Sequence, residues 1–413
     1  MTRSAPLVAV TRSLDFDVDH VAFAGPDGTL FSRSGIGFAG CGVAIRGPRD
    51  AVVGELSGMA VDNPLALPGT GPVALGALPF MSGEGAELVV PSLLVGTDED
   101  GNRWATAVGP SPENGAPPAD PERQVQDRIH AVAEGPRPIG PGAFTVSAQR
   151  SPGEWMQVVA DAVARIKAGE LEKVVLARAV TVSADAPIPI QSILARLARS
   201  YPDCFLYLVD GFCGASPELL VSRSGDVVRA QPMAGTAPRA GEPEADDRAA
   251  AALLASAGYR HEHQVTIDAV HDTLLQFSSY VDYEPEPSVV ALSNVVHLAT
   301  NVEGRLSHPP ASILELVDAL HPTPAVCGRP TAEALRLIEE VEGFDRGRYA
   351  GAVGWVDAAG NGAFAVSIRG ASVSGNQAVI VGGNGIVADS DPATELVETR
   401  AKMQAMLSAM VRP

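Results

Sequence analysis

The order of apolar runs after residue 150 restricts the fold of this chain more than any other feature. Runs with strand character, such as residues 173–182, alternate with segments whose apolar residues recur at helical spacing, such as residues 190–201. Two of the strand-like runs meet at Ser224-Gly225-Asp226, a sequence typical of a hairpin turn. Hairpin strands with helices between them favour an α+β fold with antiparallel sheets over a doubly wound parallel sheet.

Further helices and strands are expected in the same part of the chain. Ser151-Pro152-Gly153-Glu154 has the spacing of a capping box with proline at the first helical position, so a helix should follow it. Residues 244–280 should be helical with an interruption at Gly258, and residues 392–411 should form a closing helix. Strands are expected at residues 349–357, 362–373 and 377–387.

Composition divides the chain near its first third. Residues 109–142 are rich in proline, glycine and charge, which is typical of an exposed connector. Residues 1–108 hold short strand-like runs separated by glycine and proline, whereas the denser alternation follows residue 150. We therefore expect a variable N-terminal part at 1–108, a connector at 109–150 and a catalytic part at 151–413.

The charge of the chain excludes some partners. A net charge of −19 and a pI near 4.8 argue against nucleic acid, because binding to phosphates needs clustered cations. The apolar run near the N-terminus is too short for a signal peptide, and no stretch approaches the length of a membrane span. We expect a cytoplasmic protein without a membrane partner, and the acidic surface suits a monomer. Four cysteines without metal-ligand spacing are expected to be free thiols: Cys41, Cys204, Cys213 and Cys327.

Lysine is rare in this chain, which makes each lysine informative. Of 30 Lys and Arg residues, only Lys167, Lys173 and Lys402 are lysines. Lys173 begins an apolar strand and shares a face with Val175 and Ala177, so it should be buried. A desolvated lysine can lose its proton near neutrality and act as a base. The simpler alternative is a lysine at the strand edge whose ammonium reaches solvent.

Three charged residues near the C-terminus suggest a metal site. Glu395, Glu398 and Lys402 fall at i, i+3 and i+7, so they share one face of a helix. The preceding "GGNGIV" is interpreted as a glycine-rich turn whose N–H groups face an anion, and two carboxylates beside it suit Mg²⁺. The simpler interpretation is a solvated stripe with an ion pair. Glu262 offers a third carboxylate, and its flanking histidines lack zinc spacing.

Glu218 is a candidate general acid. It directly precedes three apolar residues, and desolvation there would raise the pKa of its carboxyl so that it could donate a proton near neutral pH. The alternative is that Glu218 faces water beside Pro217. "MAGTAPR" at residues 233–239 supplies a further glycine-bearing turn with a hydroxyl.

A series of motifs in specific order identifies a family. The motifs are "KVVLAR", "SPELL", "QPMAGTAPR", "EHQVTID", "VHLATNVEGRL", "LHPTPAVCGRP", "RGRYAGAVGW", "FAVSIRGA", "GGNGIVADSDP" and "ATELVETRAK". Over roughly residues 154–406 the chain resembles the chorismate-utilising enzymes, and most closely their isochorismate synthases. The resemblance implies a single α+β unit with two large stacked antiparallel β-sheets and helices on the outside. It also implies chorismate as substrate and Mg²⁺ as cofactor.

The resemblance assigns a role to each matching position. Lys173 would be the base that activates water for attack at ring carbon 2, and Glu218 the acid that protonates the departing 4-hydroxyl. The implied metal ligands are Glu262, Glu395 and Glu398. The implied substrate-binding residues are Gly235, Thr236, His297, Cys327, Tyr349, Arg369, Gly383 and Lys402.

Comparison within the family favours water as nucleophile. The relatives that add ammonia usually carry glutamine at the position of Lys173, and those that resemble aminodeoxychorismate synthase often carry lysine at the position of Ala234. Salicylate synthases share the water-adding step and then eliminate pyruvate, but they often carry threonine at the position of Cys327. We therefore expect an isochorismate synthase for menaquinone or siderophore biosynthesis, with salicylate synthase as the alternative.

The chain also departs from the family pattern. Gly258 and Tyr259 replace a Lys-Asp pair that usually precedes the Glu-His motif, and this loss motivates a third possibility, a non-catalytic chorismate-binding homologue. Asn384 replaces a small residue, in a turn where asparagine tolerates left-handed backbone.

Overall fold

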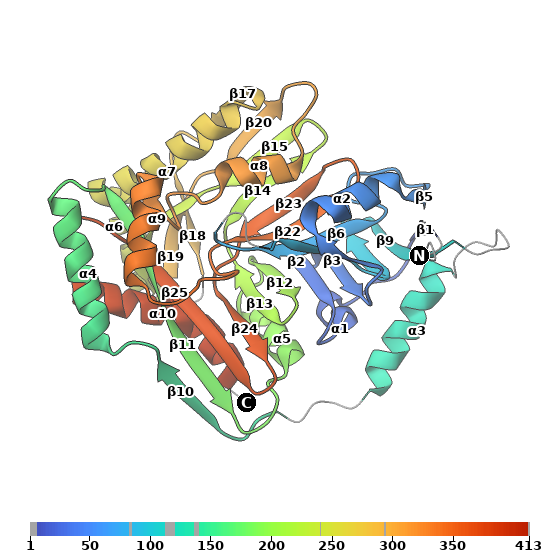
Figure 1. Ribbon diagram of the computed structural model, residues 1–413, viewed down its shortest axis with the longest axis horizontal. Helices are drawn as coiled ribbons and strands as arrows, with labels where there is room; N and C mark the ends of the chain where they lie inside the picture. Colours follow the sequence, from blue (N-terminus) through green and yellow to red (C-terminus); the bar gives the residue numbers. More distant parts are fainter. Residues whose placement is uncertain are drawn as a thin grey trace.

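Two large β-sheets, stacked face to face, form the centre of the molecule (Figure 1). The computed structural model describes residues 6–81, 85–111, 120–135, 140–239, 241–292 and 295–411. Within these residues the larger sheet has 13 strands and the smaller has 9. Their strands are antiparallel apart from one parallel pair in the larger sheet. The prediction of an α+β fold with two large stacked antiparallel sheets is confirmed.

The larger sheet combines strands from both ends of the chain. Its order is β10 (Phe144–Ala148), β11 (Lys173–Ala184), β25 (Gln377–Ile386), β24 (Gly370–Ser374), β13 (Phe212–Ser216), β12 (Phe205–Val209), β2 (Thr29–Arg33), β3 (Ile36–Cys41), β8 (Leu93–Thr97), β9 (Arg103–Pro110), β1 (Leu7–Ser13) and β5 (Ala60–Asp62), with β21 (Gly328–Arg329) on β11. The longest ladder joins β11 to β25, with Val175 opposite Gly385 and Ala177 opposite Gly383. This ladder carries one wall of the site described below.

The smaller sheet is also built from both parts of the chain. Its order is β17 (Ser278–Tyr283), β20 (Val302–Leu306), β15 (Val227–Gln231), β14 (Leu219–Ser224), β23 (Gly362–Val366), β22 (Ala352–Asp357), β6 (Val73–Leu78), β7 (Glu87–Val90) and β4 (Ile45–Pro48). A separate small sheet holds β16 (Met233–Pro238), β19 (Val295–Ala299) and β18 (Ser288–Ala291). The N-terminal strands thus extend both large sheets, as Figure 1 shows for the blue strands beside β12 and β22.

Aromatic and aliphatic side chains fill the space between the two large sheets. Phe38 of β3 packs against Trp355 of β22 with ring centroids 4.7 Å apart, and Trp104 of β9 lies against the other side of Phe38 at 5.9 Å. Val73 and Val353 of the smaller sheet belong to the same buried cluster. Burial of this much apolar surface holds the two sheets together.

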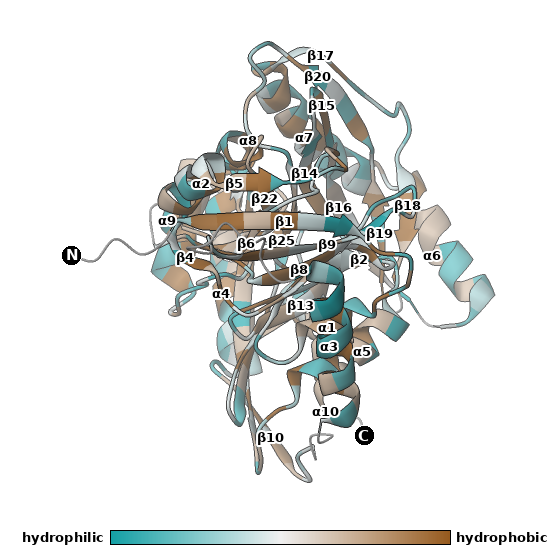
Figure 2. Ribbon diagram, turned by 90° about the vertical axis from the view of Figure 1, so that its right-hand side faces the viewer, coloured by the Kyte–Doolittle hydropathy of each residue, from teal (hydrophilic) through white to brown (hydrophobic). Residues whose placement is uncertain are grey.

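Helices cover the outer faces of the sheets. The helices are α1 (His20–Ala24), α2 (Arg49–Gly58), α3 (Pro121–Glu134), α4 (Pro152–Lys167), α5 (Ile190–Ser200), α6 (Pro243–Ala255), α7 (Ala257–Leu275), α8 (Ile313–Leu320), α9 (Thr331–Val341) and α10 (Pro392–Val411). Leu194 of α5 and Met406 of α10 pack on the larger sheet, whereas Leu316 of α8 packs on the smaller one. The outward side of α3 is largely hydrophilic (Figure 2).

Several local predictions are confirmed. Ser151 caps α4 in a complete capping box with Glu154, and Pro152 is the first residue of that helix. The turn at Gly225 and Asp226 joins β14 to β15, and Gly225 has a φ of +63°. The glycine is needed there because other residues rarely adopt positive φ.

Other local predictions are wrong in detail. The helical break lies at Ser256, whose hydroxyl caps α7 by accepting from the Tyr259 N–H, and Gly258 lies inside the first turn. The expected strand at 362–373 is two strands, β23 and β24, because Arg369 between them has a φ of +57°. The proposed connector contains α3 and β10, and its residues 112–119 and 136–139 lie outside the described residues. The division of the chain at 109–150 stays a prediction.

A buried ion pair between Glu342 and Arg346 holds the backbone of β11. Glu342 and Arg346 are 1% and 2% exposed, and their closest charged atoms are 2.5 Å apart. Glu342 Oε1 accepts from the Ala177 N–H at 2.7 Å, while Arg346 Nη2 donates to the Val175 carbonyl at 2.7 Å. Arg346 also lies over the ring of Phe80 at 4.3 Å. The pair therefore links the end of α9 to the strand that carries Lys173.

We expect Glu342→Ala to lower the free energy of unfolding by about 3–5 kcal/mol, because it leaves the buried Arg346 without a counter-charge. Urea unfolding of the purified variant measures this loss. Glu333→Ala is the matched control on the same helix: Glu333 pairs with Arg336, whose side chain is 73% exposed, so the loss should be about 0–1 kcal/mol. Equal losses in the two variants would contradict the anchoring role of the buried pair.

Candidate active site

A cavity of about 410 Å³ opens where β11 and β25 meet β16, β19, α7 and the first turns of α10. Most of the residues selected from the sequence line it, although they are spread over 230 positions of the chain. The lining includes Lys173, Glu218, Gly235, Thr236, Glu262, His297, Tyr349, Arg369, Gly383, Glu395, Glu398 and Lys402. The structure thus brings these residues together, while their individual roles stay predictions.

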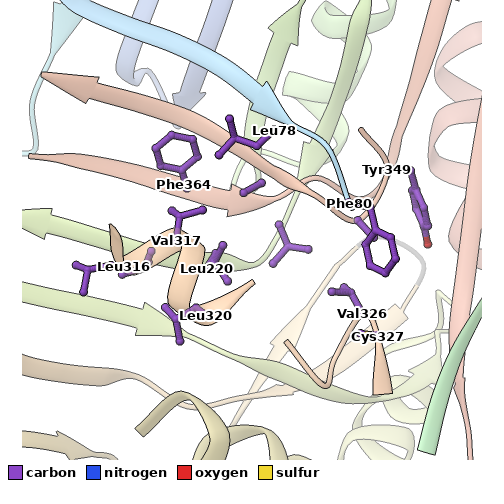
Figure 3. Close-up of a cluster of buried hydrophobic side chains, with 14 of the residues drawn as sticks. Leu78, Phe80, Leu220, Leu316, Val317, Leu320, Val326, Cys327, Tyr349 and Phe364 are labelled. Atoms are coloured by element: carbon purple, nitrogen blue, oxygen red, sulfur yellow. The ribbon is translucent and has the colours of Figure 1, made fainter. Parts of the chain in front are cut away.

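Cys327 is the exception among the selected residues. It does not line the cavity, although Ala325 and Val326 do. The thiol is fully buried in the apolar cluster shown in Figure 3, beside Val326, and burial raises its pKa to about 12. The structure places the Cys327 side chain in the core and not at the cavity wall, so its contact with the substrate stays a prediction.

Lys173 lies at the first position of β11 and is buried, as predicted. Its Nζ donates to Glu262 Oε1 on α7 at 2.7 Å. Burial acts to raise the pKa of Glu262, but the charge and hydrogen bond of Lys173 outweigh burial and lower it. Gly385 on β25 makes room for the pair, since a Cβ there would lie 2.7 Å from Lys173 Cε. No local sequence pattern indicated this ion pair.

Glu218 is a buried carboxyl, as its position before an apolar run predicted. It is 5% exposed, and burial raises its pKa from 4.5 to about 7. The Met233 N–H lies 3.5 Å from Oε1, and the positive charges of Lys173 and Arg369 partly oppose the shift. A carboxyl with this pKa exists in both protonation states near neutral pH, so it can donate a proton there.

Arg369 provides a buried cation for an anionic ligand. Its Nη2 donates to His297 Nε2 at 3.0 Å, and its Nη1 is buried without a hydrogen-bond partner among the residues that the structure describes. Burial, Arg369 and Lys402 hold the pKa of His297 well below its usual range, so the imidazole is neutral. Because Nε2 accepts from Arg369, the proton is on Nδ1, within reach of Thr236 Oγ1 at 3.0 Å. The unpartnered Nη1 suits a carboxylate ligand.

Lys402 is the second cation at this wall. Its Nζ lies 2.6 Å from Glu398 Oε1 and 3.2 Å from the Gly383 carbonyl. Tyr349 is buried nearby and interacts with the backbone of Gly383, and burial raises the pKa of its phenol. Gly383 must be small, since a Cβ there would lie 2.7 Å from the Leu176 carbonyl.

The remaining carboxylate, Glu395, is positioned differently from Glu262 and Glu398. Its pKa is raised to about 7, mainly by burial; Glu398 and Glu262 add to the rise, while the Ser390 hydrogen bond and the charge of Lys402 oppose it. A divalent cation would relieve the mutual repulsion of the three carboxylates at this cavity. All of their ligand atoms are oxygens, which Mg²⁺ prefers. The set fits Mg²⁺ in its chemistry. Within the described residues, however, no three His, Cys, Asp or Glu side chains lie close enough together to hold a metal ion as they stand. Glu262 and Glu398 each form an ion pair with a lysine.

Two glycine-bearing segments are strands rather than turns. Residues 382–385 continue β25 and pair with β11 along one edge, so they form a strand. Residues 233–238 form β16, with a register shift at Gly235, whose φ is +76°. The interpretation of "GGNGIV" as a turn is therefore wrong, while its role toward an anion stays a prediction. The chain turns only after β25, where the Val387 N–H donates to Ser390 Oγ.

The structure adds residues to the cavity that were not among the site residues selected from the sequence. Tyr259, Asp389, Ser390 and Asp391 line the cavity, and Asn384 contacts Glu395. The segment "ADSDP" directly before the closing helix was the available signal for the turn residues, since Asp and Ser favour such positions. Nothing in the local sequence indicated that Asn384 reaches Glu395.

Comparison with known proteins gives consistent results. The family model described as "Chorismate binding enzyme" matches residues 51–411. Isochorismate synthase DhbC of Bacillus subtilis (strain 168) is 37% identical over 350 residues, which cover 82% of this chain and 81% of that protein. The chain therefore belongs to the family of chorismate-binding enzymes.

Solved structures share the fold. The menaquinone-specific isochorismate synthase MenF from Escherichia coli superposes with a TM-score of 0.81 at 23% identity, covering 98% of this chain and 95% of that one. Anthranilate synthase component I from Streptococcus pneumoniae TIGR4 has a TM-score of 0.71 at 20% identity, covering 98% and 93%. Because both kinds of enzyme have this fold, the reaction must be argued from the site.

We expect Glu218→Gln to stabilise the folded protein increasingly as pH rises. The folded-state pKa of Glu218 is about 7 and its ordinary value 4.5, so burial of the carboxyl costs nothing below pH 4.5. The cost grows as pH rises from 4.5 to 7 and then levels off, at about 3 kcal/mol. Unfolding by urea at pH 5, 6, 7 and 8 measures the difference between variant and wild type. Glu303→Gln, at an exposed position on β20, should show a constant difference; a constant difference for Glu218→Gln would contradict the raised pKa.

Proposed function

We propose that the protein is an isochorismate synthase, which converts chorismate to isochorismate. The observation that carries the proposal is the buried Glu218, with a pKa near 7, in the same cavity as Lys173. An acid that is partly protonated near neutrality and an amine that can accept a proton are the two groups that the exchange of a ring hydroxyl for water requires. Curated relatives of this chain that carry the name isochorismate synthase support the same reaction.

Each group would move one proton. Lys173 would take a proton from water as the water oxygen bonds to ring carbon 2 and the ring double bonds shift. Glu218 would give its proton to the 4-hydroxyl, which leaves with the electrons of its carbon–oxygen bond as water. Lys173 donates to Glu262 in the structure, so this contact must loosen and the amine must be neutral before it can accept a proton.

The cations of the cavity would bind the two carboxylates of chorismate. Arg369 Nη1 is a buried donor without a partner, and Lys402 lies across the same wall beside Gly383. Tyr349 offers a phenol hydrogen bond in that region. Gly235, Thr236 and His297 would line the ring, with His297 acting as a neutral hydrogen-bonding group.

The enzyme would require Mg²⁺, held by Glu262, Glu395 and Glu398. Mg²⁺ bound there would neutralise these carboxylates and hold the ring carboxylate of the substrate. Support comes from the three acidic side chains that line one cavity. The charges of Glu262 and Glu398 raise the pKa of Glu395. A cation on Glu262 and Glu398 would compete with Lys173 and Lys402 for their oxygens.

We further propose a cytoplasmic, monomeric enzyme that serves menaquinone or siderophore synthesis. The described cysteines are all free, which suits a reducing compartment. No helix in the described part of the chain is long and apolar enough to cross a membrane. The relatives include proteins named for both menaquinone and siderophore pathways.

Incubation of the purified protein with chorismate, with and without Mg²⁺, tests the proposed reaction. We expect a Mg²⁺-dependent mixture of chorismate and isochorismate without pyruvate, resolved by chromatography. Salicylate together with pyruvate would instead identify a salicylate synthase. Chorismate binding without any turnover would identify a non-catalytic homologue.

Replacement of Lys173 tests the base. Lys173→Ala should lower kcat at least about 100-fold, because it removes the proposed general base. Chorismate binding with Mg²⁺, measured by calorimetry, should remain within a few-fold. Lys167→Ala is the control, since Lys167 is exposed at the end of α4 and should leave kcat unchanged. Undiminished turnover of the Lys173 variant would refute the assignment.

The pH profile tests the acid. Since Glu218 must be protonated to act and its pKa is about 7, kcat/KM should fall roughly tenfold per pH unit above about pH 7. Initial rates between pH 5.5 and 9 at saturating Mg²⁺ measure this limb. A rate that stays constant up to pH 9 would exclude Glu218 as the proton donor.

A further inference from the structure

We infer that Asn384 is a positioning residue that presets the Glu395 carboxylate for a divalent cation. The inference rests on the proposed function, because it concerns the same carboxylates. It goes beyond that function by giving a role to a residue that neither the acid, the base nor the substrate-binding set includes.

The amide of Asn384 holds Glu395 at two points. Asn384 Nδ2 donates to the Glu395 carbonyl at 3.2 Å and also to Glu395 Oε2. One donor group thereby fixes both the main chain and the side chain of the same residue, at the start of α10. Asn384 is 2% exposed and lies on β25, so the donor itself cannot move freely.

The holding group is neutral, which distinguishes Glu395 from the other two carboxylates. Lys173 neutralises Glu262 and Lys402 neutralises Glu398. The groups on Glu395 are an amide and the Ser390 hydroxyl. A neutral donor orients a carboxylate without supplying a competing positive charge, so no ion pair has to be broken before a cation can bind Glu395. We therefore expect Glu395 to be the carboxylate whose orientation is already set when the cation arrives.

The surroundings argue against a purely space-filling role for Asn384. Its Oδ1 is buried without a hydrogen-bond partner, and an unsatisfied buried polar atom costs about 1–3 kcal/mol. An alanine at this position would avoid that cost. The flanking Gly383 and Gly385 carry no side chains, so the amide is the one side chain that this part of β25 directs at Glu395. The contact with Glu395 is the physical reason for an amide here.

Calorimetric titration with MgCl₂, in the absence of chorismate, tests the inference. Asn384→Ala should weaken Mg²⁺ binding about tenfold, because the carboxylate must then be ordered by the cation itself. The Mg²⁺ concentration for half-maximal turnover should rise by a similar factor, whereas kcat at saturating Mg²⁺ should stay within about twofold. Asn384→Ser keeps a donor and should fall between the two proteins; it also serves if the alanine variant does not fold.

Asn361→Ala is the matched control. Asn361 is also buried and donates its Nδ2 to a carboxylate, Asp357 Oδ2, at 2.9 Å, but neither residue lines the cavity. This variant should lose stability and keep the wild-type affinity for Mg²⁺. A loss of affinity as large as that of Asn384→Ala would show a general effect of destabilisation and overturn the inference.

Two further outcomes separate the inference from the proposed function. If the wild type binds Mg²⁺ and forms isochorismate while Asn384→Ala has unchanged Mg²⁺ affinity, the positioning role is wrong and the function stands. If the wild type forms isochorismate without any divalent cation, the cation site fails, and the positioning role fails with it.

Discussion

The buried contact between Glu342 and Arg346 is the interaction on which the geometry of the cavity depends. It holds the backbone of β11 at Val175 and Ala177, and Val175 is two residues after Lys173 in that strand. The same strand supports β25 through their shared ladder, and β25 carries Gly385, which leaves space for Lys173, and Gly383, whose carbonyl accepts from Lys402. Glu342 and Arg346 would each be costly to bury without the other. As a pair, they fix the position of β11 through directional hydrogen bonds, which an apolar contact would not provide.

Different degrees of burial give chemically similar groups different states in one cavity. Burial raises the pKa of Glu218 to about 7, so this carboxyl is partly protonated near neutral pH. Glu262 stays ionised because its ion pair with Lys173 lowers its pKa. His297 stays neutral because burial, together with the positive charges of Arg369 and Lys402, lowers its pKa. Acid, base and cation-binding groups can therefore coexist at one pH, although the chain as a whole is strongly acidic.

Much of this arrangement could be predicted from sequence, and the failures have physical causes. The capping box at Ser151 and the hairpin at Gly225 are local, so their signals lie within a few residues. The burial of Glu218 followed from its apolar neighbours. The burial of Cys327 in the core and the pairing of residues 382–385 with β11 were not foreseen, because both depend on segments that are distant in sequence. The ion pair of Lys173 with Glu262 spans 89 positions and leaves no local trace.

Both large sheets contain strands from before and after the segment 109–150, so the chain cannot be cut there without splitting each sheet. The motifs of the family lie after residue 150, but β2 and β6 complete the hydrogen bonding of β12 and β22. Trp104 and Phe38 of the early strands also cover the apolar face of the smaller sheet. A fragment restricted to the motif-bearing residues would expose two open strand edges and an uncovered apolar surface, so it would self-associate before it could fold as an enzyme.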